Sequence, residues 1–133
     1  MASNIDAIGP VSGDGYDSSG HKAPGYAMSG KADFYVLYRW RLKTGMEQQF
    51  TDAWAQMTEL IREQRGGLGS RLHYRDDGWW VAYAAWPSRD HWMRSKDLGP
   101  ADQALARLMN DAIAERRPAE ELLPVRDLIA GKR

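Results

Sequence analysis

The sequence predicts an α+β fold in which helices cover an antiparallel sheet. Three observations support this. A β-rich alternating run over residues 34–43 passes directly into a segment with helical periodicity. Two short β-rich segments are joined by Asp76-Asp77-Gly78, a strong hairpin signal because Asp and Gly tolerate positive φ. Two more helical segments and a last strand follow, and 133 residues suffice for one domain.

The first strand, residues 34–43, carries apolar side chains on both of its faces. One face holds Phe34, Val36, Tyr38, Trp40 and Leu42, and the other holds Tyr35, Leu37, Arg39 and Arg41. A helix is predicted next, because Thr44 and Glu47 have the spacing of a capping box. It is expected to run to about Arg65, where Gly66-Gly67 ends it as a glycine cap. Its buried stripe is Phe50, Trp54, Met57, Leu60 and Ile61.

The hairpin is predicted to consist of strands Ser70–Arg75 and Trp79–Trp86. Pro87 stops the second strand, because proline cannot donate to the ladder. Ser88 is a good N-cap for a helix that begins near Arg89.

The C-terminal part is predicted to hold a second helix and the last strand. Gly99-Pro100 interrupts the helical region, and the next helix is expected over Ala101–Arg117 with Pro118 closing it. The final strand is expected over Leu122–Ala130, and Pro124 suggests that its start lies at an edge.

These elements follow the order strand, helix, strand, strand, helix pair, strand. That order is the ferredoxin-like split βαβ pattern, with an interrupted second helix. The helices cover one face of the sheet. Because Tyr35 and Leu37 make the other face apolar as well, a second sheet is expected against it.

Residues 1–33 have a different composition from the rest of the chain. Glycine, proline, serine and aspartate punctuate them without helical or strand periodicity, so they are predicted to be a flexible N-terminal arm before a domain at 34–133. One alternative is an over-long start, with Met28 as the natural initiator. Another is an arm that lies over a partner subunit, fixed by Tyr16 and Tyr26.

Composition makes several classes of function poor candidates. The chain has no cysteine, and its 18 basic and 18 acidic residues balance, so neither thiolate chemistry nor a nucleic-acid partner is expected. No apolar run approaches the ~20 residues that span a bilayer, and no secretory signal is recognisable, so a cytoplasmic protein is expected. The three histidines, His21, His73 and His91, lack metal-ligand spacing, and no metal or cofactor is expected.

Two segments carry a family resemblance. The first is Tyr35–Gly45, a strand followed by Lys-x-Gly, and the second is Gly66–Trp92, which contains the strand-end Trp86-x-Ser88. Over roughly Phe34–Ile129 the chain resembles the antibiotic biosynthesis monooxygenase family, small proteins of the dimeric α+β barrel type. The resemblance implies a homodimer that pairs sheet to sheet, and an apolar slot between sheet and helices that takes a small aromatic substrate.

Cofactor-independent oxygenation is the activity that the resemblance implies. An electron-rich phenol or quinol can give an electron to dioxygen once it is deprotonated, so the protein needs an apolar slot, a base and hydrogen-bond donors. In this interpretation Tyr38 holds a substrate oxygen, and His91 or, second, His73 is the base. Arg71 holds an anionic group, and the slot is formed by Trp86, Tyr83, Trp54 and Trp92. Core packing for the aromatics and a solvated surface for the charged residues are the competing interpretations.

The chain departs from the family at one position. Many members carry a histidine nine residues after the strand-end tryptophan, where this chain has Ser95. The haem-degrading relatives use an Asn, a Trp and a His; the Asn position holds Tyr38 here, and no histidine follows His91, so haem binding is not expected. Two other functions therefore stay open: a catalytically silent dimer that binds a small ligand or assists another enzyme, and an isomerase or cyclase that uses the same slot.

Overall fold

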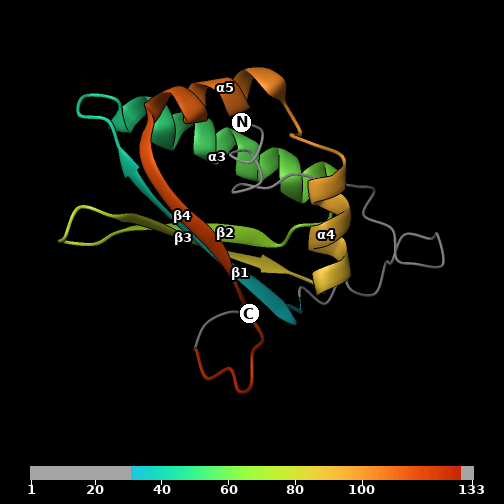
Figure 1. The fold of residues 1–133 in the computed structure, drawn as a ribbon. Coiled ribbons are helices and arrows are strands. Elements are labelled where there is room, and N and C mark those ends of the chain that lie inside the picture. Colours follow the sequence, from blue (N-terminus) through green and yellow to red (C-terminus); the bar gives the residue numbers. More distant parts are fainter. Residues whose placement is uncertain (1–30, 130–133) are drawn as a thin grey trace.

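A computed structural model of the protein describes residues 31–129. Its elements confirm the predicted order (Figure 1): β1 Phe34–Leu42, α3 Glu47–Gln64, β2 Gly69–Tyr74, β3 Trp80–Trp86, α4 Arg89–Asp97, α5 Gln103–Ala112 and β4 Ile113–Leu122. The predicted N-terminal arm lies outside the described residues, apart from its last three. Among the described residues, no helix is both long enough and apolar enough to cross a membrane.

The four strands form one antiparallel sheet in the order β2-β3-β1-β4. The register places Tyr38 opposite Ala82 and Phe34 opposite Trp86 on the two central strands. Figure 1 shows α3 and α5 stacked over one face of this sheet, with α4 beside the end of β3. The predicted α+β class and ferredoxin-like topology are therefore confirmed.

The core lies between the sheet and its helices. The predicted inner face of β1 is buried, since Phe34, Val36, Tyr38 and Trp40 are each at most 4% exposed. From α3 the buried side chains are Phe50, Ala53, Met57 and Ile61, and from α5 they are Ala106, Met109 and Ala112. Burying large apolar side chains such as these contributes roughly 1.5–3 kcal/mol each to folding.

The end of the last helix and the position of the last strand differ from the prediction. The helix expected over 101–117 stops at Ala112, and the chain turns directly into β4 at Ile113. The strand expected over Leu122–Ala130 instead ends at Leu122. Pro118 does not close a helix, because it lies inside β4, beside a register shift opposite Tyr38. An edge strand tolerates proline at such an irregularity, where no ladder donor is needed.

The start of α3 also differs from the prediction. Thr44 and Gly45 form a turn, with Gly45 at φ +88°, and the N-cap is Met46 without a side-chain hydrogen bond. The Glu47 carboxylate reaches back, and its Oε1 accepts from Gly45 N at 3.0 Å. Glu47 thus acts as the capping-box acid, but its carboxylate binds the backbone N–H of Gly45 instead of that of Thr44.

Three predicted local signals are confirmed. Ser88 is the N-cap of α4, with its Oγ accepting from His91 N at 3.3 Å. Gly66, at φ +87°, follows the end of α3 as a left-handed cap residue. Gly78, at φ +96°, completes the turn of the β2–β3 hairpin.

Among residues 31–129, no helix covers the second face of the sheet. Tyr35 of β1 stacks on Tyr83 of β3, with ring centroids 4.8 Å apart and planes at 11°. Farther along this face, Arg39 pairs with Glu120 at 2.6 Å. The segment after β4, residues 123–129, lies beside the two tyrosines and carries several exposed apolar side chains. We call this surface the open face, defined by Tyr35, Leu37, Arg39, Val81 and Tyr83.

Candidate functional site

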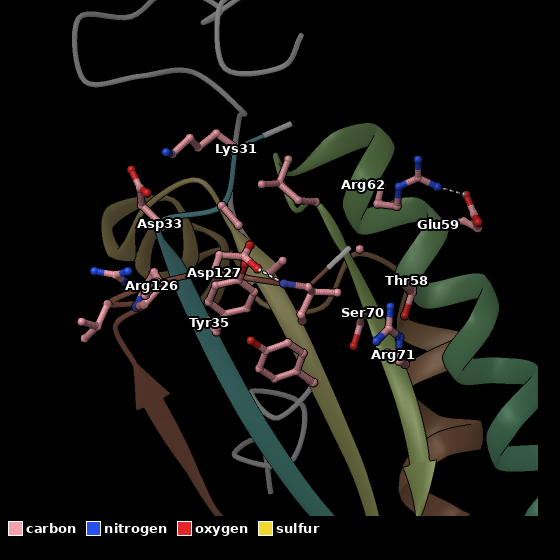
Figure 2. Close-up of a pocket in the computed structure, with 18 residues that line it drawn as sticks. Lys31, Asp33, Tyr35, Thr58, Glu59, Arg62, Ser70, Arg71, Arg126 and Asp127 are labelled. Atoms are coloured by element: carbon pink, nitrogen blue, oxygen red, sulfur yellow. Dashed lines mark hydrogen bonds and ion pairs between the residues drawn. The ribbon is translucent and has the colours of Figure 1, made fainter. Parts of the chain in front are cut away.

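A wide cleft lies where β2 begins, at the edge of the sheet. Its volume is about 740 Å³. Figure 2 shows Thr58 of α3, Ser70 and Arg71 of β2 and Tyr35 of β1 around it, with the Arg62 side chain of α3 turned toward Glu59. This size lies within the range of clefts that hold drug-sized ligands.

A small apolar cavity adjoins the cleft on the helix side of the sheet. Its volume is about 30 Å³, which is room for one or two water molecules but not for an aromatic ring. The aromatic walls are Tyr38, Trp54 and Trp86. The cavity shares four lining residues with the cleft, namely Thr58, Gly69, Ser70 and Ala85. The cavity is therefore the inner end of the cleft, and we call it the inner cavity.

Small residues create the connection between cleft and inner cavity. Gly69 pairs with Ala85 across the first position of the β2–β3 ladder, so no large side chain fills the sheet edge there. Gly67 lets Ile61 approach closely, because a Cβ built on it would lie only 2.7 Å from Ile61 Cγ2, and at 3.5 Å it would be in ordinary contact with Trp86 Cη2. The glycine-rich segment at residues 66–69 thus ends the helix and also lines this cavity.

Two residues that line the inner cavity each carry a buried polar atom with no hydrogen-bond partner among residues 31–129. The atoms are Ser70 Oγ and Trp86 Nε1, both fully shielded from solvent. Trp86 as a residue is 2% exposed. Leaving a buried donor unpaired costs about 1–3 kcal/mol, so such atoms are uncommon in stable folds.

Tyr38 and Trp92 form a buried hydrogen bond beside the inner cavity. Trp92 Nε1 donates to Tyr38 Oη at 2.9 Å. Trp92 is 2% exposed, packs on Phe34 with centroids 5.6 Å apart, and is covered by Lys96. Tyr38 lines the inner cavity, whereas Trp92 stands behind it and is not part of its wall. Trp92 therefore holds Tyr38 in place from α4 and is no wall of the slot.

The two histidines proposed as bases lie apart from the cavity wall. His91 is 8% exposed at the start of α4, with Nδ1 2.7 Å from Ser88 Oγ. His73 is exposed on β2, with Nδ1 3.3 Å from Val81 O. Neither lines the cleft or the inner cavity. Ser95, the residue at the family's histidine position, is fully buried within α4.

Tyr83 and Arg71 lie in the outer part of the cleft. Their positions pair across β2 and β3, so both side chains belong to the open face. Burial raises the pKa of the neighbouring Tyr35 hydroxyl, and Tyr83, Asp127 and Asp33 add to this effect. Tyr35 therefore stays protonated at neutral pH and presents a neutral donor to the cleft. Arg71 is a cation at this end of the cleft, whereas Arg62 is paired with Glu59 at 3.2 Å.

The structure thus brings together four of the five predicted substrate-binding residues along one continuous space. Trp54 and Trp86 line its inner end, and Tyr83 and Arg71 line its outer end. Sequence reasoning missed Ser70. Strand alternation places Ser70 with Leu72 on the helix side, and that signal could have identified it.

The described residues hold no cluster of three side chains of the types that bind metals. The residues that line the inner cavity instead offer aromatic carbon, the hydroxyls of Tyr38, Thr58 and Ser70, and the indoles of Trp54 and Trp86. These groups suit an aromatic molecule that carries an oxygen atom.

Comparison with solved structures shows the same fold. A Bordetella bronchiseptica protein that bears the family's name shares 20% identity at a TM-score of 0.62, over 71% of this chain and 99% of that one. SnoaB of Streptomyces nogalater, a cofactor-independent oxygenase, shares 15% identity at a TM-score of 0.55, over 77% of this chain and 100% of that one. A Caulobacter crescentus protein shares 14% identity at a TM-score of 0.60, over 78% and 100%.

Sequence comparison gives the family directly. No curated protein matches the chain at a significant level. Residues 33–107 match the family described as antibiotic biosynthesis monooxygenase, a range that runs from the start of β1 into α5 and includes all the walls of the inner cavity. The chain belongs to the antibiotic biosynthesis monooxygenase family.

Proposed function

We propose that the protein is a cofactor-independent monooxygenase that acts on a phenolic, quinol or polyketide-type aromatic substrate. One observation carries the proposal: a tryptophan-lined inner cavity opens into a cleft of about 740 Å³, enough for a polycyclic ring system. Membership of the family supports the same reaction class, and SnoaB shows that a protein of this fold can be a cofactor-independent oxygenase.

The reaction is balanced without an external reductant. An activated ring CH₂ group, such as that of an anthrone, loses a proton and becomes an anion. The anion gives one electron to dioxygen, and the two radicals combine to form a carbon–oxygen bond. Loss of water from the resulting hydroperoxide leaves a carbonyl, so that CH₂ and O₂ become C=O and H₂O. All four electrons that reduce dioxygen come from the substrate carbon.

Each residue role follows from its position along the cleft. Trp54 and Trp86 pack against the reacting edge of the substrate, and Tyr83 contacts its outer rings. Arg71 neutralises an acidic substituent in the outer cleft. Tyr38, held by Trp92, presents its hydroxyl in the cavity wall to a substrate oxygen. These contacts exclude water from the anion and leave a path for dioxygen.

The proton takes a different route from the one expected from the sequence. Because neither His91 nor His73 lines the cleft or the inner cavity, we propose that the substrate loses its proton to water in the open cleft. Hydrogen-bond donors in the inner cavity then stabilise the anion by preorganised dipoles. His91 has a structural role in this proposal, as a partner of the α4 cap.

The protein is also proposed to be a homodimer. The open face carries Tyr35, Leu37 and Tyr83, no helix of the described part of the chain covers it, and the exposed Leu128 and Ile129 lie near it. Exposed apolar side chains gathered on one face are typical of an interface. A second copy packed sheet to sheet would cover them and narrow the mouth of the cleft.

A silent ligand-binding or accessory dimer is the alternative. The absence of both histidines from the described wall of the cavity favours it, because neither predicted base is in place. Oxygen uptake by the purified protein with anthrones, naphthoquinols and flavonols separates the two. We expect uptake well above the protein-free rate, lowered by Trp86→Ala. Binding of these compounds without uptake would support the silent dimer, or an isomerase or cyclase if the compounds are converted.

A further inference from the structure

We propose that Ser70 Oγ and Trp86 Nε1 together bind one oxygen atom of an aromatic molecule at the inner end of the cleft. The site would accept a quinone carbonyl, a phenol or a phenolate. This site would be part of the proposed active site. Only the statement that the bound molecule is a substrate or product rests on the proposed function.

The first argument is the state of the two atoms. Both are shielded from solvent, both lack a partner, and both belong to residues that line the same small cavity. Unpaired buried donors are destabilising, so a site that retains two of them in one cavity is suited to an acceptor that arrives from outside. Their closeness to the cleft makes such an acceptor accessible.

The second argument is the chemistry of the pair. An indole N–H can only donate, and a serine hydroxyl can donate as well as accept. The matching group therefore needs two acceptor lone pairs on one atom, which a carbonyl or phenolate oxygen has. A hydrocarbon leaves both donors unpaired, and a cation is repelled by the N–H dipole.

The third argument is size. The inner cavity, at about 30 Å³, admits an oxygen atom and the ring edge that bears it, whereas the cleft, at about 740 Å³, holds the remaining rings. Thr58, Gly69 and Ala85 line both spaces and form the passage between them. The oxygen is thus fixed at the closed end, with the ring carbons against Trp54.

Calorimetric titration with two matched probes tests the site. 1,4-Naphthoquinone carries carbonyl oxygens, and naphthalene has the same ring skeleton without them. The variants are Ser70→Ala, Trp86→Phe and their double variant, which remove the donors and keep most of the volume. Trp79→Phe is the control, because it makes the same change at the hairpin end of the sheet, against Arg41 and Arg117.

We expect each single variant to bind 1,4-naphthoquinone roughly tenfold more weakly, while naphthalene affinity changes less than about twofold. The loss of 1,4-naphthoquinone affinity in the double variant should be smaller than the product of the two single fold-losses, because both donors bind the same oxygen atom. Trp79→Phe should bind both probes as the parent protein does. Unchanged thermal unfolding of the variants excludes misfolding as the cause.

Two kinds of result would overturn the inference: no binding of 1,4-naphthoquinone to the parent protein, or equal weakening of both probes. The outcome is separate from that of the proposed function. Donor-dependent quinone binding without oxygen uptake supports the site and contradicts the oxygenase. Oxygen uptake that survives in both single variants at the parental rate and KM supports the oxygenase and contradicts the site.

Discussion

Tyr38 joins the core, the inner cavity and α4 at the scale of a single residue. Its ring lies over Trp40 with centroids 5.9 Å apart, and its hydroxyl accepts from Trp92 Nε1. The residue whose hydroxyl fixes α4 therefore also lines the inner cavity. A buried polar pair of this kind is costly to break from one side only.

Replacing Tyr38 by phenylalanine should destabilise the fold. The change removes the acceptor and leaves the buried Trp92 indole N–H without this partner, so we expect the free energy of unfolding to fall by about 1–3 kcal/mol. Urea unfolding followed by circular dichroism measures this. Tyr74→Phe is the control, because Tyr74 is 61% exposed and its change should cost less than about 0.5 kcal/mol. Equal effects of the two changes would contradict the structural role of Tyr38.

His91 should prove to be structural. Changing it to alanine removes the side chain next to Ser88 Oγ and opens space at the start of α4, so we expect a stability loss of about 1–2 kcal/mol. The kcat for oxygen uptake should change less than about threefold, because His91 does not line the cavity. A fall in kcat beyond about a hundredfold at unchanged fold would restore His91 as the base.

At the scale of elements, one ion pair links α4 to β4. Arg89, the first residue of α4, donates from Nε to Glu121 Oε1 at 2.6 Å and from Nη2 to Oε2 at 3.3 Å. Hydrogen bonding from Arg89, followed by the charges of Arg89 and Lys96, lowers the pKa of the Glu121 carboxyl. The pair is exposed, so its contribution to stability is modest.

The contribution of this pair should depend on pH in a defined direction. A carboxyl whose pKa is lower in the folded state stabilises the fold above its unfolded pKa, near ~4.3, and loses that effect as pH falls through the folded value. We therefore expect Glu121→Gln to be less stable than the parent at neutral pH, by at most about 1 kcal/mol at low salt. The difference should shrink as pH falls through the folded pKa and vanish at acid pH below it.

Urea unfolding at both pH values measures this difference. Glu63→Gln, an exposed change on α3, serves as the control and should show no such trend. A stability gap for Glu121→Gln that stays constant as pH falls would show that the ion pair is not its source.

The elements also show where sequence reasoning works and where it fails. β1 and α3 were predicted closely because one face of each is buried. Apolar residues therefore recur along them with the period of a strand or of a helix. β4 was misplaced by about nine residues because it is an edge strand rich in Glu and Arg. Its side chains need no alternation where both faces are solvated, and its pairing with β1 is a long-range contact that local patterns do not encode.

At the scale of the whole molecule, the sequence predicted which residues line the site better than it predicted how they are placed relative to one another. A tryptophan at a strand end indicates a pocket, and Trp86 does line one, together with Trp54 of α3. That Trp92 stands behind Tyr38, and that Ser70 faces the cavity, depends on how α4 and β2 sit against β3. Such relations arise from packing between distant segments, so the local pattern could not supply them.

The open face of the sheet should control association. Leu37 lies at its centre, paired in register with Tyr83 and Glu120. Leu37→Lys places a charge on this partly exposed face of the monomer, beside the Arg39–Glu120 ion pair, so the monomer should stay folded while the dimer is lost. Light scattering on a size-exclusion column measures the mass. Leu98→Lys, at a residue 61% exposed beside α4, should leave the mass unchanged.

A monomeric parent protein across the concentration range, or a Leu37→Lys variant with the parental mass, would contradict the sheet-to-sheet dimer. Because the cleft borders the open face, a monomeric variant should also bind aromatic ligands more weakly than the parent does. That loss would show that the partner subunit contributes to closing the cleft.

The central claim is that the protein inserts an oxygen atom from dioxygen into an aromatic substrate without a cofactor. The most direct measurement is conversion of an anthrone by the chelator-treated protein under oxygen-18 gas, with mass spectrometry of the product. We predict a quinone that carries one heavy oxygen, formed faster than without protein and more slowly by Trp86→Phe. Product formation at the protein-free rate, or a product oxygen drawn from water, would contradict the account.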